Sequence, residues 1–135
     1  QQYMFPHVRQ AIADAWKRAN ISGASGLDGI ELHDCFTSTE YMAIDHFGFA
    51  DPGESWRAIE DGTIAMGGAC PVNASGGLIG VGHPVGATGV RMLLDAGRQV
   101  TGTAGDYQVE GARTYQTLNI GGSLGTVVSF VVART

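Results

Sequence analysis

The sequence predicts an α/β domain in which helices are layered against a sheet. Segments with the periodicity of amphipathic helices alternate with segments rich in β-branched and aromatic residues, the pattern of layered α/β folds. The last two strand-like segments are joined by a glycine-rich turn, which makes them antiparallel. With 135 residues, the chain is long enough to bury the core of one domain.

The first predicted element is a helix. Apolar or small residues recur at helical spacing over 8–19, and Pro6 fits the first turn of such a helix. A loop with three glycines then covers 22–29 and separates this helix from the first predicted strand. The short apolar segment 30–32 predicts that strand, which runs directly into the polar residues after it.

A second helix is expected after this strand. Thr37 followed three residues later by Glu40 is a capping-box pattern, and the helix is expected to end near Gly48. The segment 50–71 then shows no period and contains several glycines and prolines, so we expect an irregular excursion. One short helix around Trp56–Ile59 is the most regular structure that this segment predicts.

The stretch Asn73–Gly89 is expected to be a loop that builds a site. Glycine is so frequent in it that the main chain must bend tightly or approach another group closely. His83 lies inside it, and Pro84 biases this histidine toward an extended backbone. A helix over about 90–100 comes next, and its first N–H groups are free to meet an anion.

Two strands are expected at the end of the chain. The segment 113–118 has the β-branched and aromatic content of a strand, and the Val/Phe run 126–133 is typical of a buried one. We expect the glycine-rich segment 119–125 to turn the chain between them.

Charge and composition exclude several classes of partner. The formal net charge is −5 and the eight basic residues are scattered, so no surface for nucleic acid or anionic membrane is predicted. No apolar run approaches the roughly 20 residues of a membrane-spanning helix. The two cysteines form no disulfide framework and no zinc-type spacing. We therefore expect a reducing compartment, the cytoplasm or a eukaryotic peroxisome, and no metal.

Three segments that carry reactive side chains lie after predicted strands or within the glycine-rich stretch. They are 33–36 (His-Asp-Cys-Phe), 82–84 (Gly-His-Pro) and 119–122 (Asn-Ile-Gly-Gly). Sites of α/β sheets lie at such strand ends. A cysteine beside imidazoles is suited to acid–base work, and histidine and glycine N–H groups can bind an oxyanion. This set fits acyl transfer or enolate chemistry better than redox or metal chemistry.

Each of these residues also has a purely structural interpretation. His33 is alternatively an ordinary buried histidine, and Cys35 a small core residue, because free cysteine is often buried. We expect Cys70, beside a proline in a loop, to be structural. His7 and His46 lie on predicted helices and are expected to face solvent or to cap them.

Two motifs resemble those of a known family. Asn73–Gly89 resembles the Asn-x-x-Gly-Gly…Gly-His-Pro-x-Gly signature in the C-terminal half of thiolases. His33-Asp-Cys-Phe36 looks like the corresponding motif of the sterol-carrier-protein-x branch, where other thiolases have Asn-Glu-Ala-Phe. The resemblance implies a thiolase-like α-β-α domain with a five-stranded mixed sheet, whose first strand we expect to be missing. Residues 1–135 would then be the C-terminal domain of a chain of roughly 400 residues.

The resemblance implies catalytic roles for three residues. His83 would activate the nucleophilic cysteine and help to bind the thioester oxygen. His33 would complete this first oxyanion hole. Cys35 would be the acid–base thiol, which most thiolases take from a Cys-x-Gly near the end of the chain.

Further residues would bind the substrate or its oxyanion. Asn119-Ile-Gly121 occupies the place of that Cys-x-Gly, and the resemblance assigns Gly121 to the second oxyanion hole with Asn119 beside it. Asn73, Gly76 and Gly77, from the glycine-rich motif, are included in the same predicted binding set.

The implied reaction defines the partners. An acyl-CoA is the substrate, coenzyme A takes part as substrate rather than as cofactor, and an N-terminal thiolase half supplies the nucleophile. We expect this chain to be inactive alone, and the full-length protein to be a homo-oligomer, a dimer or tetramer. Two alternatives are a thiolase-like aldolase acting on a steroid or fatty acyl-CoA with a partner protein, and a non-catalytic dimerisation or docking module.

Overall fold

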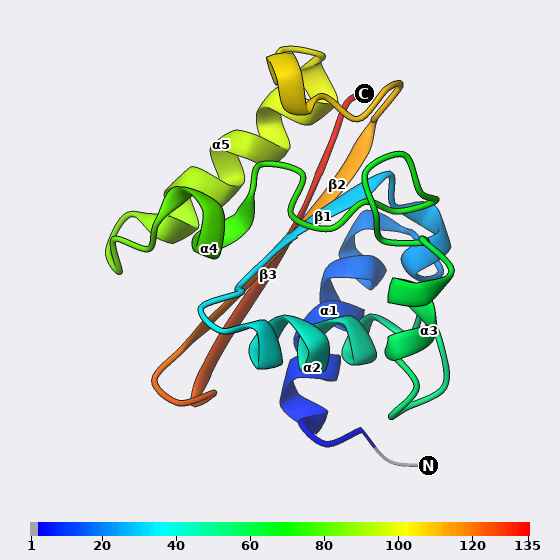
Figure 1. The fold of residues 1–135 in the computed structure, drawn as a ribbon, viewed down its shortest axis with the longest axis vertical. Coiled ribbons are helices and arrows are strands. Elements are labelled where there is room, and N and C mark those ends of the chain that lie inside the picture. Colours follow the sequence, from blue (N-terminus) through cyan, green and yellow to red (C-terminus); the bar gives the residue numbers. More distant parts are fainter. Residues whose placement is uncertain (1–2) are drawn as a thin grey trace.

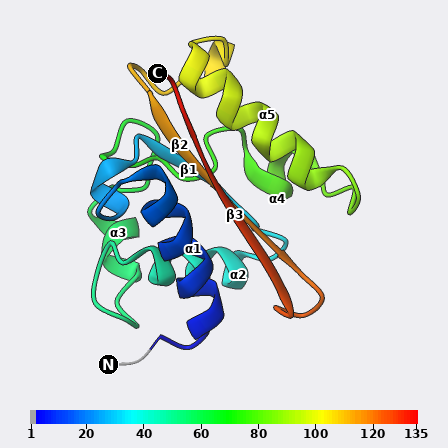
Figure 2. The same cartoon turned by 180° about the vertical axis from the view of Figure 1, so that it is seen from behind.

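The structure is a computed structural model that describes residues 3–135. Its elements are α1 (Pro6–Ala19), β1 (Gly29–Leu32), α2 (Thr37–Phe47), α3 (Trp56–Glu60), α4 (Gly77–Val81), α5 (Thr88–Thr101), β2 (Thr114–Gly121) and β3 (Thr126–Ala133). Helix α5 covers one face of the sheet, and α1 and α2 cover the other (Figure 1 and Figure 2). This arrangement confirms the layered α/β class.

The sheet has three strands in the order β1-β2-β3 among the described residues, which are the three strands that the sequence pattern predicts. The five-stranded sheet with its first strand missing would leave four strands, so that expectation is wrong for this chain. Strands β1 and β2 are parallel, and β2 and β3 are antiparallel. At the other edge of β1, within residues 3–135, only Val72 forms a parallel bridge, with Ile30. Pro71 has no N–H to donate and Asn73 has a φ of 53°, so the extended segment around Val72 ends after one bridge.

Helices α1 and α2 bury their apolar faces against one side of the sheet. Burying one such side chain contributes roughly 1.5–3 kcal/mol of stability. Because this cluster has more buried members than the one on the α5 side, we call it the principal core. Its buried members include Val8, Ile12, Trp16, Ile30, Leu32, Ile44, Phe47 and Leu118.

A smaller cluster lies on the α5 side of the sheet. Ala96 and Val100 of α5 pack with the fully buried ring of Tyr115. The same ring covers the start of β1, where a Cβ on Gly29 would overlap it. A glycine is therefore needed at the first position of β1.

The N-terminal boundary of α2 differs from the one that the sequence predicts. Thr37 is the first helical residue of α2 rather than its cap, and Phe36, the residue before it, makes no side-chain capping bond. The capping-box interpretation is therefore wrong. The end of α2 at Gly48, in the left-handed region with φ 75°, and the short helix α3 at Trp56–Glu60 are confirmed.

The glycine-rich segment and the last turn are more regular than expected. Five residues of the predicted loop form helix α4, and α5 begins at Thr88. Asn119–Gly121 was expected to turn, but it belongs to β2, which pairs with β3 as far as Gly121 and Thr126. The turn is confined to residues 122–125, where the Gly125 N–H donates to the Gly122 carbonyl.

Parallel pairing places the reactive segments at one edge of the sheet. Leu32 at the end of β1 is the partner of Leu118 in β2, so His33 and Asn119 follow at the same level. The N-terminus of α5 lies at this edge too, since the position of a Gly89 Cβ is 3.7 Å from the Asn119 amide nitrogen. Within residues 3–135, no helix is long and apolar enough to cross a membrane.

Candidate active site

A cavity of about 800 Å³ opens at this edge of the sheet. Its wall combines the segment after β1, the first turns of α2, the loop before α5, the first turns of α5, and the β2–β3 hairpin. Five of the eight site residues predicted from the sequence line this cavity: His33, Cys35, His83, Asn119 and Gly121. The rest of the lining is mostly apolar and includes Met42, Val85, Leu93, Ile120 and Phe130.

Two histidines meet at the centre of this group. The ring centroids of His33 and His83 lie 4.8 Å apart, and the rings are nearly perpendicular at 89°. His33 is buried, and its Nδ1 atom has no hydrogen-bond partner among the described residues. Burial, and then the positive charge of a protonated His83, lower the pKa of His33 below its usual 6.5. His33 is therefore a neutral imidazole at pH 7 and offers one N–H without a charge.

His83 is held by the residues that come after it. Its Nδ1 atom lies 2.7 Å from the hydroxyl of Thr88, the first residue of α5. The Thr88 hydroxyl also lies 3.2 Å from the Pro84 carbonyl, to which it donates. Since Nδ1 is engaged with this hydroxyl, Nε2 is the nitrogen left for chemistry in the cavity.

Cys35 and Cys70 occupy different environments. Cys35 is half-buried in the cavity wall, with its Sγ atom 3.6 Å from the Thr39 hydroxyl. Cys70 is 3% exposed and belongs to the principal core, which confirms the structural interpretation of that residue. Burial, and then the nearby Asp28 carboxylate, raise the pKa of Cys70 to about 12.

Alkylation under native conditions should separate the two thiols. We expect iodoacetamide to label Cys35 within minutes and Cys70 only after unfolding, because the reactive form is the exposed thiolate. Peptide mapping by mass spectrometry at increasing times measures both sites in one sample. Equal labelling rates for the two cysteines in the folded protein would contradict this assignment.

Asn119 and Gly121 line the cavity from β2. The Asn119 side-chain amide donates to the Met92 Sδ atom at 3.0 Å, which links the end of β2 to α5. Gly121 is exposed at the end of the strand.

The other three predicted binding residues do not line the cavity. The Asn73 side-chain oxygen accepts from the Leu32 N–H at 2.8 Å, so this residue joins the glycine-rich segment to β1. Gly76 precedes α4, and Gly77 is its first residue. The structure therefore brings five of the eight residues together and places Asn73, Gly76 and Gly77 in the supporting framework.

Asp34 holds α4 against the end of β1. Its carboxylate accepts from the Leu78 N–H at 2.6 Å and from the Ile79 N–H at 3.5 Å, while the side chain is buried. The carboxylate lies where a Cβ on Gly77 would be, and Gly77 has a φ of 64°. Asp34 stands between His33 and Cys35, so this contact joins their segment to the stretch that carries His83.

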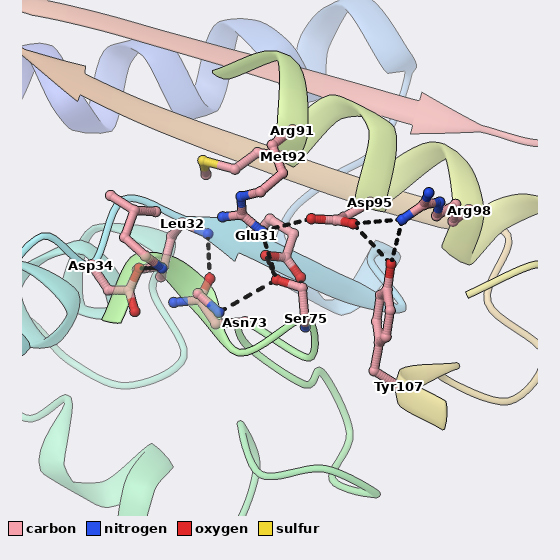
Figure 3. A network of polar contacts seen from close by, with 12 residues as sticks. Glu31, Leu32, Asp34, Asn73, Ser75, Arg91, Met92, Asp95, Arg98 and Tyr107 are labelled. Atoms are coloured by element: carbon pink, nitrogen blue, oxygen red, sulfur yellow. Dashed lines mark hydrogen bonds and ion pairs between the residues drawn. The ribbon is translucent and has the colours of Figure 1, made fainter. Parts of the chain in front are cut away.

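A second carboxylate, this one on β1 itself, holds the same stretch. Glu31 accepts from the Ser75 hydroxyl at 2.6 Å and from the Ser75 N–H at 3.1 Å (Figure 3). Arg91 of α5 donates to the Ser75 hydroxyl at 3.1 Å and pairs with Asp95 at 2.7 Å. Tyr107 donates to the other Asp95 oxygen at 2.8 Å. This polar network therefore connects β1, the glycine-rich stretch and α5.

Glu31 gives this network a pH dependence. Its side chain is 0% exposed, and burial raises its pKa from the ordinary 4.5 to about 7, against the lowering effect of the Ser75 bonds. The folded chain thus holds the Glu31 proton more tightly than the unfolded chain. The resulting stabilisation is complete below pH 4.5 and is lost as the pH rises to 7.

Replacing Glu31 by glutamine should remove this pH dependence. A shift of this size corresponds to roughly 3 kcal/mol of unfolding free energy between pH 4.5 and pH 7. We expect the stability difference between about pH 5 and about pH 8, measured by urea unfolding, to be smaller in Glu31→Gln than in the unchanged protein. The exposed Glu110→Gln variant is the control and should behave like the parent. An unchanged pH difference in Glu31→Gln would contradict the burial argument.

The remaining histidines differ from each other. His7 is exposed, and its Nε2 atom lies 2.7 Å from the Leu124 carbonyl. His46 was expected to face solvent or to cap its helix, but it is buried, with its Nε2 atom accepting from the Phe5 N–H and its Nδ1 atom 2.6 Å from the Met42 carbonyl. The expectation for His46 is therefore wrong. Among residues 3–135, no group of three or more His, Cys, Asp or Glu is arranged to hold a metal.

Sequence reasoning missed four residues that support the site: Glu31, Ser75, Thr88 and Arg91. Glu31 sits between two apolar residues in a short strand, a pattern that predicts a solvent-facing side chain. The four-residue spacing of Arg91 and Asp95 on the predicted helix was a usable signal for an ion pair. Nothing in the sequence alone indicated that Ser75 would lie beside them.

Comparisons with known proteins agree with these motifs. The model of the family described as "Thiolase C-terminal domain-like" matches residues 1–134. Acetyl-CoA acetyltransferase of Methanothermobacter thermautotrophicus is 42% identical over 124 residues, covering 92% of this chain and 32% of the relative. Sterol carrier protein 2 of Homo sapiens is 34% identical over 122 residues, covering 89% of this chain and 22% of the relative. The chain thus spans a third or less of these relatives.

A solved structure shares the fold. The chain described as "Ltp2-ChsH2(DUF35) aldolase" superposes with a TM-score of 0.83 at 22% identity, covering 96% of this chain and 32% of that one. At this identity the likeness concerns the fold. Together with the family match over nearly the whole sequence, it leads to one conclusion: this chain belongs to the thiolase C-terminal domain-like family.

Proposed function

We propose that this chain is the C-terminal part of a longer thiolase, which cleaves a 3-ketoacyl-CoA with coenzyme A or condenses two acyl-CoA molecules. Membership in the family and similarity to an acetyl-CoA acetyltransferase support this proposal. The observation that carries it is the contact between the His33 and His83 rings in a cavity wall that also contains Cys35.

In this proposal, His83 acts as the base for a cysteine supplied by the N-terminal half. His83 takes the thiol proton, and the thiolate attacks the 3-keto carbon of the substrate. The bond between C2 and C3 then breaks, leaving an acyl group on the cysteine and an enolate on the departing acyl-CoA. Cys35 donates its proton to C2 of this enolate and recovers one from the thiol of the incoming coenzyme A. The coenzyme A thiolate then takes the acyl group, and the released cysteine regains its proton from His83.

Two groups of donors stabilise the negative charge that develops on the thioester and keto oxygens. His33 is suited to an oxyanion because burial keeps it neutral by lowering its pKa, so that its N–H binds without adding a fixed charge. Gly121 and Asn119 lie on the β2 side of the same cavity and are proposed for the second oxyanion. The apolar part of the lining is proposed to contact the acyl chain.

The proposal includes partners. The chain spans 32% of the archaeal acetyltransferase, and we propose that the remaining length contains the half that supplies the nucleophile. The isolated chain is then expected to have no thiolase activity, and the full-length protein is proposed to be a homo-oligomer.

Thiolysis of acetoacetyl-CoA by the full-length protein tests the proposal. We expect coenzyme A-dependent formation of acetyl-CoA from this substrate. Cleavage of a 3-hydroxyacyl-CoA without added coenzyme A, in the absence of thiolysis, would instead favour the thiolase-like aldolase, for which the shared fold of the solved aldolase chain is the supporting observation. Undiminished turnover after loss of both Cys35 and His83 would favour a non-catalytic docking module.

A further inference from the structure

Thr88 makes the hydrogen bond that orients His83. The Thr88 hydroxyl is 2.7 Å from the His83 Nδ1 atom and 3.2 Å from the Pro84 carbonyl. Thr88 is 2% exposed and is the first residue of α5, so the helix fixes where its hydroxyl lies. The Thr88 N–H also donates to the Pro84 carbonyl, at 3.0 Å, which holds the three residues in one tight turn.

The threonine hydroxyl has a single hydrogen to donate. The Pro84 carbonyl oxygen can only accept, so in its bond to this oxygen the hydroxyl uses that hydrogen and turns an oxygen lone pair toward His83. An oxygen lone pair accepts a hydrogen bond from Nδ1–H, which is present both in the cationic imidazole and in the neutral tautomer with the proton on Nδ1. The bond therefore survives when Nε2 gains or loses its proton.

We propose that Thr88 is a positioning residue that holds His83 in the tautomer with the proton on Nδ1 and the lone pair on Nε2. This inference rests on the proposed function, in which Nε2 must be free to take a proton from the nucleophilic thiol. With the opposite tautomer, Nε2 already carries a proton and accepts none. Fixing the tautomer of a catalytic histidine is a role that a neighbouring acceptor performs in other enzymes.

The nitrogen chemical shifts of His83 in the full-length protein test the tautomer directly. Uniformly ¹⁵N-labelled histidine gives a separate pair of ring signals for each residue, and the pair absent from His83→Asn belongs to His83. We expect the Nδ1 signal at the position of a protonated nitrogen and the Nε2 signal at that of an unprotonated one, at a pH where the ring is neutral. An unprotonated Nδ1 would show that the hydroxyl donates to the ring, and would overturn the proposal.

Replacing Thr88 tests the consequence for turnover. In Thr88→Val the shape is kept and the hydroxyl is lost, so we expect kcat for acetoacetyl-CoA thiolysis to fall roughly 10- to 100-fold, with KM unchanged. Thr88→Ser keeps the hydroxyl and should retain most of the turnover. Thr117→Val is the matched control, because Thr117 is a buried threonine whose hydroxyl has no hydrogen-bond partner within the described residues.

The outcomes separate this inference from the proposed function. Parental kcat in Thr88→Val, or a Thr88→Ser variant as slow as Thr88→Val, would overturn the role of the hydroxyl. If His83→Asn kept full turnover, the proposed function would fail, while the nitrogen shifts would still decide the tautomer. If Thr88→Val does not fold, Thr88→Ser and the shifts of the unchanged protein still test the proposal.

Discussion

A full-length protein in which His83 is replaced by asparagine is expected to cleave acetoacetyl-CoA about a thousandfold more slowly than the unchanged protein. Asparagine keeps a polar side chain of similar reach, but it has no basic nitrogen. The variant therefore loses the proton acceptor for the nucleophilic thiol while it retains an N–H donor for the thioester oxygen. The expected change is in kcat, with a small effect on KM.

The control for this prediction is His7→Asn. His7 is exposed on α1 and lies outside the cavity lining, so its replacement should leave turnover unchanged. Steady-state kinetics with acetoacetyl-CoA and coenzyme A compare the two variants under the same conditions. A His83→Asn protein with parental kcat would exclude His83 as the base and remove the chemical basis of the proposed function.

Replacing Gly77 by alanine is expected to destabilise the fold by roughly 3 kcal/mol. The new Cβ would overlap the carboxylate of Asp34, and Gly77 has a φ of 64°, where residues other than glycine are strained. Moving the Asp34 carboxylate also breaks its bonds to the Leu78 and Ile79 N–H groups. The effect therefore combines steric overlap, backbone strain and the loss of partners for a buried charge.

Gly80→Ala in the same helix is the matched control. A Cβ at Gly80 would meet no atom within 4 Å in the part of the chain that the structure describes, apart from its own helix backbone and its two neighbours, and the Gly80 backbone is not in the left-handed region. Alanine is the better helix former by about 0.5–1 kcal/mol, so this variant should be as stable as the parent or slightly more stable. Urea unfolding followed by tryptophan fluorescence measures both. Equal stability of Gly77→Ala and Gly80→Ala would refute the role of the Asp34 contact.

The order of the main elements could be predicted because their periodicity is strong. The helical spacing over 8–19 corresponds to α1, and the apolar run 126–133 forms β3. The expectation that this run is a fully buried central strand is wrong, because β3 is an edge strand of the sheet in residues 3–135 and its Val128 and Phe130 are exposed. Parallel pairing of β1 and β2 explains why His33 and Asn119 reach one edge of the sheet. Helix α4 was missed because five residues with two glycines show no helical period, and its stability depends on the distant carboxylate of Asp34.

The buried polar residues were the least predictable. The face of β1 that carries Glu31 is covered by α5, so this side chain is buried. The sequence of one short strand does not tell which of its two faces another element covers. His46 lies three residues after buried Ala43 and one before buried Phe47. That spacing places His46 on the buried face of α2, whereas the polar character of the histidine side chain led to the expectation that it faces solvent. In both cases the partner that satisfies the side chain is far away in the sequence, Ser75 for Glu31 and Phe5 for His46.

The supporting contacts explain why the reactive residues come together. Glu31 and Asp34 flank His33 in the sequence, and each accepts two N–H or O–H donors from the stretch that carries His83. The cavity residues are therefore positioned by two buried carboxylates, one on β1 and one just after its end. Replacing either carboxylate should lower turnover by displacing His33, Cys35 or His83, because neither carboxylate lines the cavity.

Cys35 is proposed as the acid–base thiol of the cavity, and isotope exchange tests this role most directly. The full-length Cys35→Ala protein is incubated with acetyl-CoA in D₂O, and deuterium at the acetyl methyl group is measured by mass spectrometry, with Cys70→Ala as the control. We predict that Cys35→Ala loses this exchange but still transfers the acetyl group between acetyl-CoA and labelled coenzyme A, whereas Cys70→Ala does both. Exchange at the parental rate in Cys35→Ala would contradict the proposed role of this thiol.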